Sequence, residues 1–265
     1  MGVSTTGRRN LVVVRAGNGS LHPGWIAGGR RDFDLFISYF GTETDKFRDD
    51  ADHYEMRRGP KWSCIADLLA EQPALLEAYD AFWFPDDDLA ADTDTLNRMF
   101  GLFHGFGLAL AQPALTEDSY HSYNTLLRQD GVVLRYVGFV EVMAPIFSRE
   151  ALARCLDTFA ESRSGWGIDW IWPGRIEQDR ADAIAVLDAT PVTHTRPLGG
   201  ELYKNNPEMN PRHEADRVIR KHGLERDRAE RKYQLHGVVR RTAPSWWQRL
   251  SLAVRRWSSL VRARR

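Results

Sequence analysis

Short apolar runs that end in turn residues, with helix-length stretches between them, most constrain how this chain folds. The first run is Leu11–Val14, which leads to Gly17-Asn18-Gly19, and the second is Asp34–Phe40, which ends before Gly41. Runs of this length and β-branched content, closed by glycine turns, are typical of buried strands. Because helical spacing follows in Lys61–Leu69, the pattern predicts an α/β layered fold.

The rest of the chain continues this alternation up to Tyr203. We predict a surface loop at Thr42–Pro60, strands at Tyr79–Phe84, Leu108–Ala111, Leu134–Met143 and, as the last one, Ala183–Leu187, and helices at Thr93–Phe103 and Ser148–Phe159. Ser148 is expected to cap its helix, since a serine hydroxyl accepts a hydrogen bond from a first-turn N–H. Beyond Tyr203 the chain becomes charge-dense, so we predict one domain over residues 1–203 and a helical extension over residues 204–265.

Composition excludes several classes of protein. Of the 265 residues 43% are hydrophobic and 27% charged, as in folded globular proteins and unlike disordered chains. Two cysteines, Cys64 and Cys155, cannot form a disulfide framework or a multi-cysteine zinc site. We therefore expect the protein to reside in a reducing cytosol. There is no apolar run of roughly 18 residues, as a membrane-spanning helix needs, and no apolar region of a secretory signal near Met1.

The net charge is zero, but the charges are unevenly distributed and the C-terminal end of the chain is basic. Residues 231–265 hold ten of the 36 basic residues and no acidic one, which leaves 26 basic against 36 acidic residues before them. Drawn as a helix, residues 246–262 have an apolar stripe that contains Trp246, Leu250, Ala253, Val254, Trp257, Leu260 and Val261.

This basic, amphipathic segment predicts binding to an anionic membrane surface, because tryptophan favours the lipid interface and arginine attracts anionic headgroups. The protein would then be cytoplasmic and peripheral on the inner face of the membrane. Docking of the helix on the acidic body of the protein is the alternative. Nucleic acid is disfavoured, since a phosphate backbone would not bury the apolar face.

The turn Gly17-Asn18-Gly19 stands where a dinucleotide-binding loop would follow the first strand. The dinucleotide fingerprint requires a third glycine where His22 stands, and an acid at the end of the second strand, where Ser38 and Tyr39 stand. No lysine of a P-loop follows either. The sequence therefore favours a plain turn.

Asp86-Asp87-Asp88 follows an aromatic-rich strand and is the most informative triplet. In an extended segment Asp86 and Asp88 project to the same side, so they can hold one hard divalent cation between them. A solvated loop, or a cap for the next helix, is the alternative interpretation.

Four further residues are candidates for chemistry. His194 can ligate a divalent cation beside carboxylates, and Arg196 can bind a phosphate. The alternative interpretation is that both are polar surface residues without a functional role. Asp169 lies among aromatic residues and is either a desolvated general base or, as the spacing favours, a cap for the turn at Trp170–Trp172. Glu141 is a charged residue in a strand whose other residues are apolar. If both faces of this strand are buried, the carboxylate of Glu141 requires a partner such as an arginine, a metal ion or a substrate hydroxyl.

The order of these features resembles the GT-A fold of metal-dependent, nucleotide-sugar glycosyltransferases. The acid triplet matches the DXD motif, Gly167-Ile168-Asp169 falls where the xED motif does, and His194 falls where the C-terminal metal histidine does. The chain resembles more closely the family called domain of unknown function 707. The segments that carry this resemblance are Leu11–Pro23, Tyr79–Leu89, Leu108–Leu115, Arg135–Arg149, Ser164–Pro173 and Asp188–Gly199.

The resemblance implies a GT-A-like mixed sheet flanked by helices and a sugar transfer from a nucleotide-sugar donor to a glycan or lipid-linked acceptor. Asp86 and Asp88 would hold Mn²⁺ or Mg²⁺ against the donor diphosphate, with His194 as the further ligand.

In the same way, the resemblance implies that Asp169 deprotonates the acceptor hydroxyl of an inverting enzyme, with Glu141 as the competing base. Arg15 and Arg196 are lesser candidates for contacts with the nucleotide and its diphosphate. Two alternatives stay open: a metal-dependent phosphotransferase or hydrolase, and a non-catalytic carbohydrate-binding or membrane-scaffold module.

Overall fold

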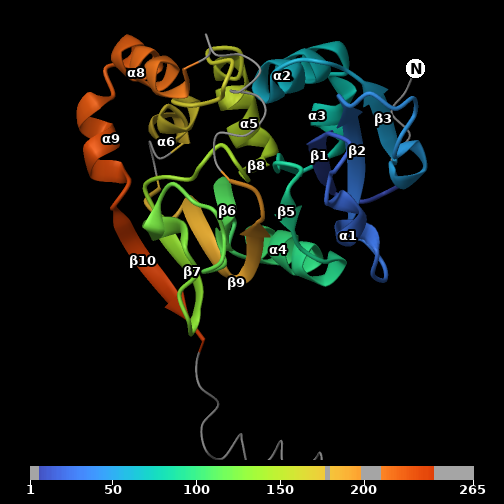
Figure 1. The fold of residues 1–265 in the computed structure, drawn as a ribbon. Helices are drawn as coiled ribbons and strands as arrows, with labels where there is room; N and C mark the ends of the chain where they lie inside the picture. The colour runs from blue at the N-terminus through green and yellow to red at the C-terminus, as the bar shows by residue number, and fades with distance from the viewer. Residues whose placement is uncertain (1–5, 177–179, 198–209, 242–265) are drawn as a thin grey trace, which may run out of the picture.

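A single mixed sheet forms the centre of the protein, and helices cover both of its faces (Figure 1). The structure is a computed structural model that describes residues 6–176, 180–197 and 210–241. The strand order is β10-β7-β9-β6-β8-β4-β1-β2-β3, with β5 paired to β9. The predicted α/β architecture is therefore confirmed.

The strands are β1 (Asn10–Ala16), β2 (Phe33–Tyr39), β3 (His53–Met56), β4 (Ala81–Trp83), β5 (Leu89–Ala90), β6 (Leu110–Leu115), β7 (Val132–Val137), β8 (Ile146–Ser148), β9 (Ile184–His194) and β10 (Leu235–Arg240). The helices are α1 (His22–Ile26), α2 (Lys61–Glu71), α3 (Ala74–Ala78), α4 (Thr93–Gly105), α5 (Arg149–Cys155), α6 (Trp172–Ile176), α8 (Pro211–His222) and α9 (Glu225–Arg231). Short 3-10 turns lie at Arg48–Asp50, Asn124–Leu126, Leu156–Thr158 and Ile168–Trp170.

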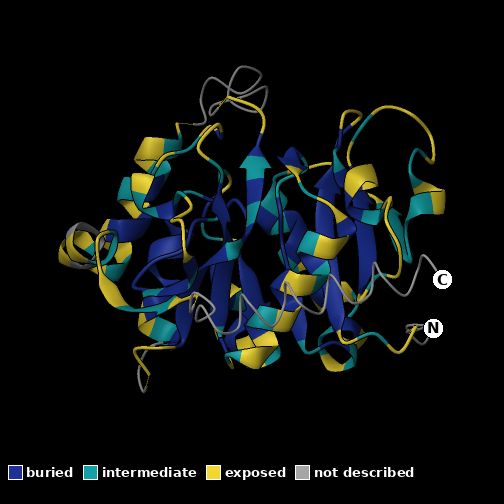
Figure 2. Cartoon of the chain, turned by 90° about the horizontal axis from the view of Figure 1, so that it is seen from below, coloured by how far each residue is buried: buried dark blue, intermediate teal, exposed yellow. Residues whose placement is uncertain are grey.

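The alternation of side chains along β1 divides the hydrophobic core into two layers. Leu11 and Val13 belong to the layer between the sheet and α2, α5, α6 and α8, whereas Val12 and Val14 belong to the layer under α1 and α4. Because both faces are covered, every residue of β1 is buried. Figure 2 shows this arrangement as dark blue strands inside a rim of partly and fully exposed residues.

Local sequence signals explain where two of the helices begin. Ser148 caps α5, since its hydroxyl accepts a hydrogen bond from the Ala151 N–H, as predicted. Asp92 caps α4 in the same way by accepting from the Thr95 N–H at 2.7 Å.

Parallel pairing brings the carboxyl ends of β1, β4 and β9 to the same edge of the sheet. β1 pairs parallel with β4, and β6 pairs parallel with β9. β8 runs antiparallel to both β4 and β6, so β4 and β9 point the same way. The loops after these three strands can therefore converge on one site, where ligands of open α/β sheets bind.

The structure corrects three predictions about strands. The segment predicted as a loop, Thr42–Pro60, contains the edge strand β3. The strand predicted at Ala183–Leu187 continues to His194. β7 ends at Val137, so residues 138–143 form a loop, and Glu141 lies on this loop instead of on a strand.

The C-terminal region is helical at α8 and α9, and it also supplies a strand that the sequence did not predict. β10 pairs antiparallel with β7 and forms one edge of the sheet. The predicted domain boundary at residues 203 and 204 and the amphipathic segment 246–262 lie outside the described residues. In the described part of the chain, no helix is long and apolar enough to cross a membrane.

Candidate functional site

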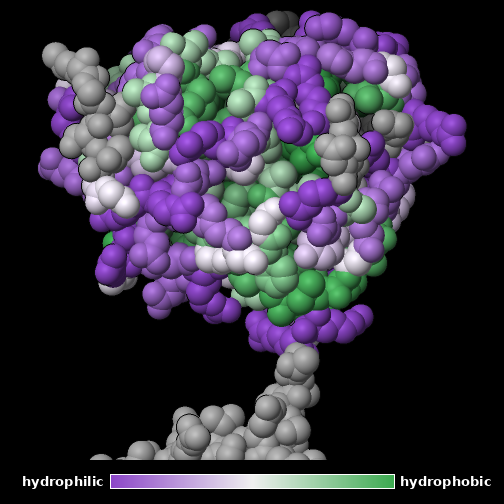
Figure 3. All heavy atoms as spheres, turned by 180° about the vertical axis from the view of Figure 1, so that it is seen from behind, coloured by the Kyte–Doolittle hydropathy of each residue, from purple (hydrophilic) through white to green (hydrophobic). Residues whose placement is uncertain are grey.

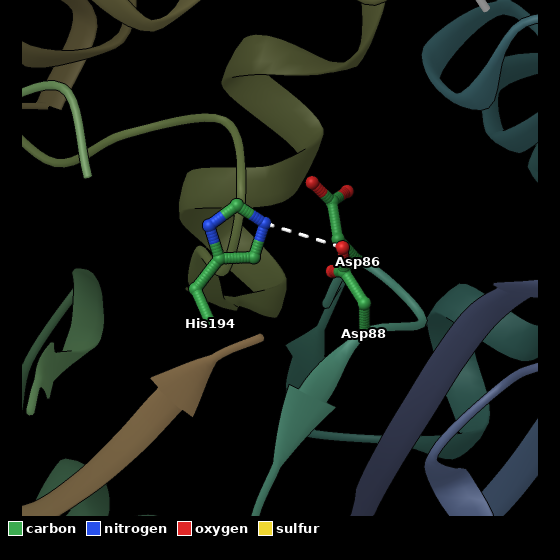
Figure 4. Close-up of side chains that lie close together, drawn as sticks. All are labelled: Asp86, Asp88 and His194. Atoms are coloured by element: carbon green, nitrogen blue, oxygen red, sulfur yellow. Dashed lines mark ion pairs between the residues drawn. The ribbon is translucent and has the colours of Figure 1, made fainter. Parts of the chain in front are cut away.

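Asp86, Asp88 and His194 gather at the carboxyl edge of the sheet (Figure 4). One ligand atom from each residue lies within 4.8 Å of the other two. The two aspartates follow β4, and His194 ends β9. Antiparallel pairing of β5 with β9 sets Leu89 opposite His194, and the neighbouring Asp88 places its Oδ2 3.3 Å from the histidine Nε2.

A hydrogen bond on the far side of the ring orients His194. Its Nδ1 lies 2.7 Å from the carbonyl oxygen of Tyr120, which can only accept, so Nδ1 carries a proton. Nε2 then faces Asp88, and in the neutral ring it has the free lone pair that a metal ligand needs. Burial lowers the pKa of His194, but the hydrogen bond and charge of Asp88 outweigh burial and leave that pKa above its ordinary value.

The environment of Asp88 fits a divalent cation. Asp88 is buried, and its Oδ1 has no hydrogen-bond partner in the protein. An unpartnered buried carboxylate oxygen is costly unless a cation completes its surroundings. Two carboxylates and one imidazole are a donor set that can hold a divalent cation. The three residues therefore could hold such an ion.

Asp87 connects the acid triplet to the turn after β1. Its Oδ2 accepts from the Gly17 N–H at 2.7 Å, and its Oδ1 accepts from Arg196 at 3.1 Å. Arg196 also donates to the carbonyl of Gly19. Burial raises the pKa of Asp87, although the Gly17 N–H and the Arg196 guanidinium act in the opposite direction. The plain turn predicted at Gly17-Asn18-Gly19 thus forms one wall of the site.

The ring of Phe40 lies beside Gly17. A Cβ at position 17 would lie 2.9 Å from this ring, so a larger residue there would require the ring to move. Phe40 follows β2 and is 43% exposed, so it presents an aromatic face beside this turn.

Arg15 is placed differently from Arg196. Its guanidinium is buried and donates to the Ser38 hydroxyl and to the carbonyls of Arg57 and Gly59. These contacts join β1 to β2 and to the segment that follows β3. Burial lowers the pKa of Arg15.

Glu141 and Asp169 are two buried carboxyl groups next to the Asp86–Asp88–His194 cluster. Glu141 is 7% exposed and Asp169 is 4% exposed, and each has one oxygen without a hydrogen-bond partner in the protein. The Val142 N–H donates to Asp169 at 3.4 Å, and the Glu141 N–H donates to Gln112 at 2.6 Å. The loop after β7 therefore carries one of these acids and contacts the other.

Their surroundings raise the pKa of both carboxyl groups. Burial raises the pKa of Glu141 to about 7; a hydrogen bond from Ser122 lowers it, and the charge of Asp86 raises it. Burial and the charge of Glu141 raise the pKa of Asp169 to about 8. The predicted capping role of Asp169 is wrong, because this residue lies inside the turn Ile168–Trp170, which begins after Gly167.

Two residues of the site, Lys61 and Tyr120, were not predicted from the amino-acid sequence. Lys61, the first residue of α2, places its Nζ 2.7 Å from Oδ1 of Asp86. Tyr120 orients His194 through its backbone carbonyl. A lysine in the first turn of a helix is unfavourable for that helix, so its position was a signal of another role. A contact made by a backbone carbonyl leaves no signal in the sequence.

The chain has a GT-A-like fold. The crystal structure of GalNAc-T7 with UDP, GalNAc and Mn²⁺ is similar, with a TM-score of 0.51 and 9% sequence identity over 72% of this chain and 44% of that one. Residues 134–235, which include Glu141, Asp169 and His194, match the family model described as "Protein of unknown function (DUF707)".

The crystal structure of TarS from S. aureus aligns with a TM-score of 0.49 and 10% identity, over 82% of this chain and 45% of that one. The chain thus spans less than half the length of either TarS or GalNAc-T7. No curated protein matches the chain in sequence.

Proposed function

We propose that this protein is a metal-dependent glycosyltransferase, which moves a sugar from a nucleotide-sugar donor to a hydroxyl group of a glycan or lipid-linked acceptor. The observation that carries the proposal is the gathering of Asp86, Asp88 and His194 beside two buried carboxyl groups, at the carboxyl edge of a GT-A-like sheet. A divalent cation held there would offset the negative charge of the donor diphosphate.

The wall of the site formed by the turn after β1 would receive the donor. Arg196 lies beside Asp87 and Gly19, and its guanidinium would bind a phosphate oxygen of a donor held there. Arg15 would act more indirectly, by holding the end of β1 against β2.

Asp169 would serve as the general base of an inverting transfer. Its carboxylate would take the proton of the acceptor hydroxyl while the acceptor oxygen bonds to the sugar carbon. The bond from that carbon to the diphosphate would break, and its electron pair would leave with the nucleoside diphosphate. A raised pKa favours this role, because a base acts best when its pKa lies near the working pH. Glu141 is the competing candidate.

Titration calorimetry with UDP, GDP and CMP, each with and without Mn²⁺, tests the proposal. We expect at least one nucleotide to bind only with Mn²⁺, and Asp88→Asn to abolish that binding without unfolding the protein. Asp130→Asn is the control, since Asp130 is an exposed aspartate paired with Arg128.

Full metal-dependent binding by both Asp86→Asn and Asp88→Asn would contradict the metal site. Binding of free glycan without nucleotide would favour a carbohydrate-binding module. Metal-dependent hydrolysis of the nucleotide without sugar transfer would favour a hydrolase.

We propose in addition that residues 246–262 hold the protein on an anionic membrane surface, on the cytoplasmic side. The stripe of apolar residues and the flanking arginines in the sequence support this role. Hydrophobic surface also gathers near the end of the described chain (Figure 3), where β10 ends at Arg240. Such an anchor would keep the site close to a lipid-linked acceptor.

A further inference from the structure

We propose that Lys61 is a built-in cation that competes with the metal ion for Asp86 and so weakens metal binding. This inference rests on the metal site of the proposed function. It gives that site a second property: the affinity for the ion would be set by a lysine of the protein as well as by the three ligands.

All three N–H groups of Lys61 have an acceptor within reach. The Nζ lies 2.7 Å from Oδ1 of Asp86, 3.1 Å from the Val142 carbonyl and 3.2 Å from the Met143 carbonyl. The side chain of Lys61 is 16% exposed and that of Asp86 is 41% exposed, so the ammonium lies mostly inside the protein while water reaches part of the carboxylate. The two carbonyls would keep the ammonium beside the cluster even if Asp86 turned away from it.

The position of Lys61 in α2 is unfavourable for the helix itself. Lys61 is the first helical residue, and Pro60 before it provides no side-chain cap. The N-terminus of a helix has a partial positive charge, so a cation in the first turn destabilises the helix. The first turn of α2 also contains no acidic residue to offset this charge. The partners of Lys61 are instead Asp86 and the loop after β7.

Each acid of the triplet has its own partner in the protein. Lys61 pairs with Asp86, Arg196 with Asp87 and His194 with Asp88. This pairing limits repulsion between the three neighbouring carboxylates when no ion is bound. An ion that uses Asp86 has to share that carboxylate with Lys61 or displace the ammonium, and both lower the affinity.

Titration of the purified full-length protein with Mn²⁺ alone tests this competition. We expect Lys61→Met to bind Mn²⁺ about tenfold more tightly than wild type, because it keeps the aliphatic stem and removes the charge. Lys61→Arg should bind as wild type does. Lys46→Met is a matched control, since Lys46 lies 2.7 Å from Glu43 and over the ring of Phe47, much as Lys61 lies over Trp62.

Unchanged or weaker Mn²⁺ binding by Lys61→Met would overturn the inference, because a purely structural role predicts loss of affinity. Lys61→Gln provides a second test if the methionine variant folds poorly, since its amide can still donate to the two carbonyls. If neither wild type nor the variants bind Mn²⁺, the metal site itself fails and the competition fails with it. If wild type binds and Lys61→Met matches it, only the competition fails.

Discussion

At the scale of single residues, the site is notable for carboxyl groups that lack hydrogen-bond partners. Asp88, Glu141 and Asp169 each have a buried oxygen without a partner in the protein. A stable fold usually satisfies such atoms, so three of them at one edge of the sheet indicate a place where binding or chemistry completes their surroundings. Arg135 and Asp188 show the contrast: this buried ion pair is fully hydrogen-bonded and holds the loop after β6 in place.

Replacing Asp169 tests the role of general base. We expect Asp169→Asn to lower kcat by about 100-fold or more, because the amide cannot take the acceptor proton. The dissociation constant of the donor should stay nearly unchanged, since the side chain is not expected to touch the nucleotide. Steady-state kinetics and calorimetry measure the two quantities.

Glu141→Gln is the matched comparison for this prediction, because Glu141 is as buried and also has a raised pKa. A loss of turnover in Glu141→Gln alone, with Asp169→Asn fully active, would assign the base to Glu141. A similar loss of donor affinity in both variants would point to a structural role for the pair.

At the scale of elements, Gly167 determines how α8 packs against the turn that carries Asp169. Its φ angle of 98° lies in the left-handed region that favours glycine. A Cβ at this position would lie 2.9 Å from the Cα of Ala215 and 3.1 Å from the Cβ of Val218, both in α8. The turn and the helix can therefore approach closely only with glycine here.

We expect Gly167→Ala to lower the free energy of unfolding by about 2 kcal/mol, from backbone strain and the displacement of α8. Gly101→Ala is the control, because Gly101 lies inside α4 and a Cβ there meets open space. That variant should be as stable as wild type or up to about 1 kcal/mol more stable. Urea denaturation measures both values, and equal stability of the two variants would contradict this account of the packing.

At the scale of the whole molecule, the basic charge is concentrated at one end of the chain. The membrane proposal predicts that the intact protein floats with anionic vesicles in a density gradient and that a protein truncated after Pro244 does not. Neutral vesicles are the control, since removal of the anionic lipid removes the attraction to arginine. Equal flotation of both proteins would reject the anchor, and binding of the separate segment to the truncated body would favour docking on the protein.

Much of the central sheet was predictable because its signals are local. The apolar runs of β1 and β2 end in turns close to their predicted positions, and Ser148 starts α5 as its side chain indicates. Asp86, Asp88 and His194 were also named from the sequence as candidate metal ligands, and the structure brings these three side chains together. Residue type and position relative to the strands suffice for such candidates, although not for the contacts between them.

The remaining errors concern polar residues whose partners are distant in the sequence. The strand predicted to end at Leu187 continues to His194 because Arg135, which is 53 positions earlier, neutralises Asp188 inside the sheet. β10 was missed because its residues are exposed or half-buried and its partner strand, β7, is distant in the sequence. Glu141 was placed on a strand because its neighbours are apolar, yet those neighbours are buried in a loop.

The alternation of strands and helices, the turns between them and the kinds of side chain available for chemistry follow from the amino-acid sequence, because they depend on residues close together in the chain. Which of these side chains meet depends on how the elements pack. The parallel pairing of β1 with β4 and the pairing of β5 with β9 bring Asp88 to His194, and the packing of α2 brings Lys61 to Asp86. Such contacts depend on strand order and helix packing, which no local pattern of residues specifies.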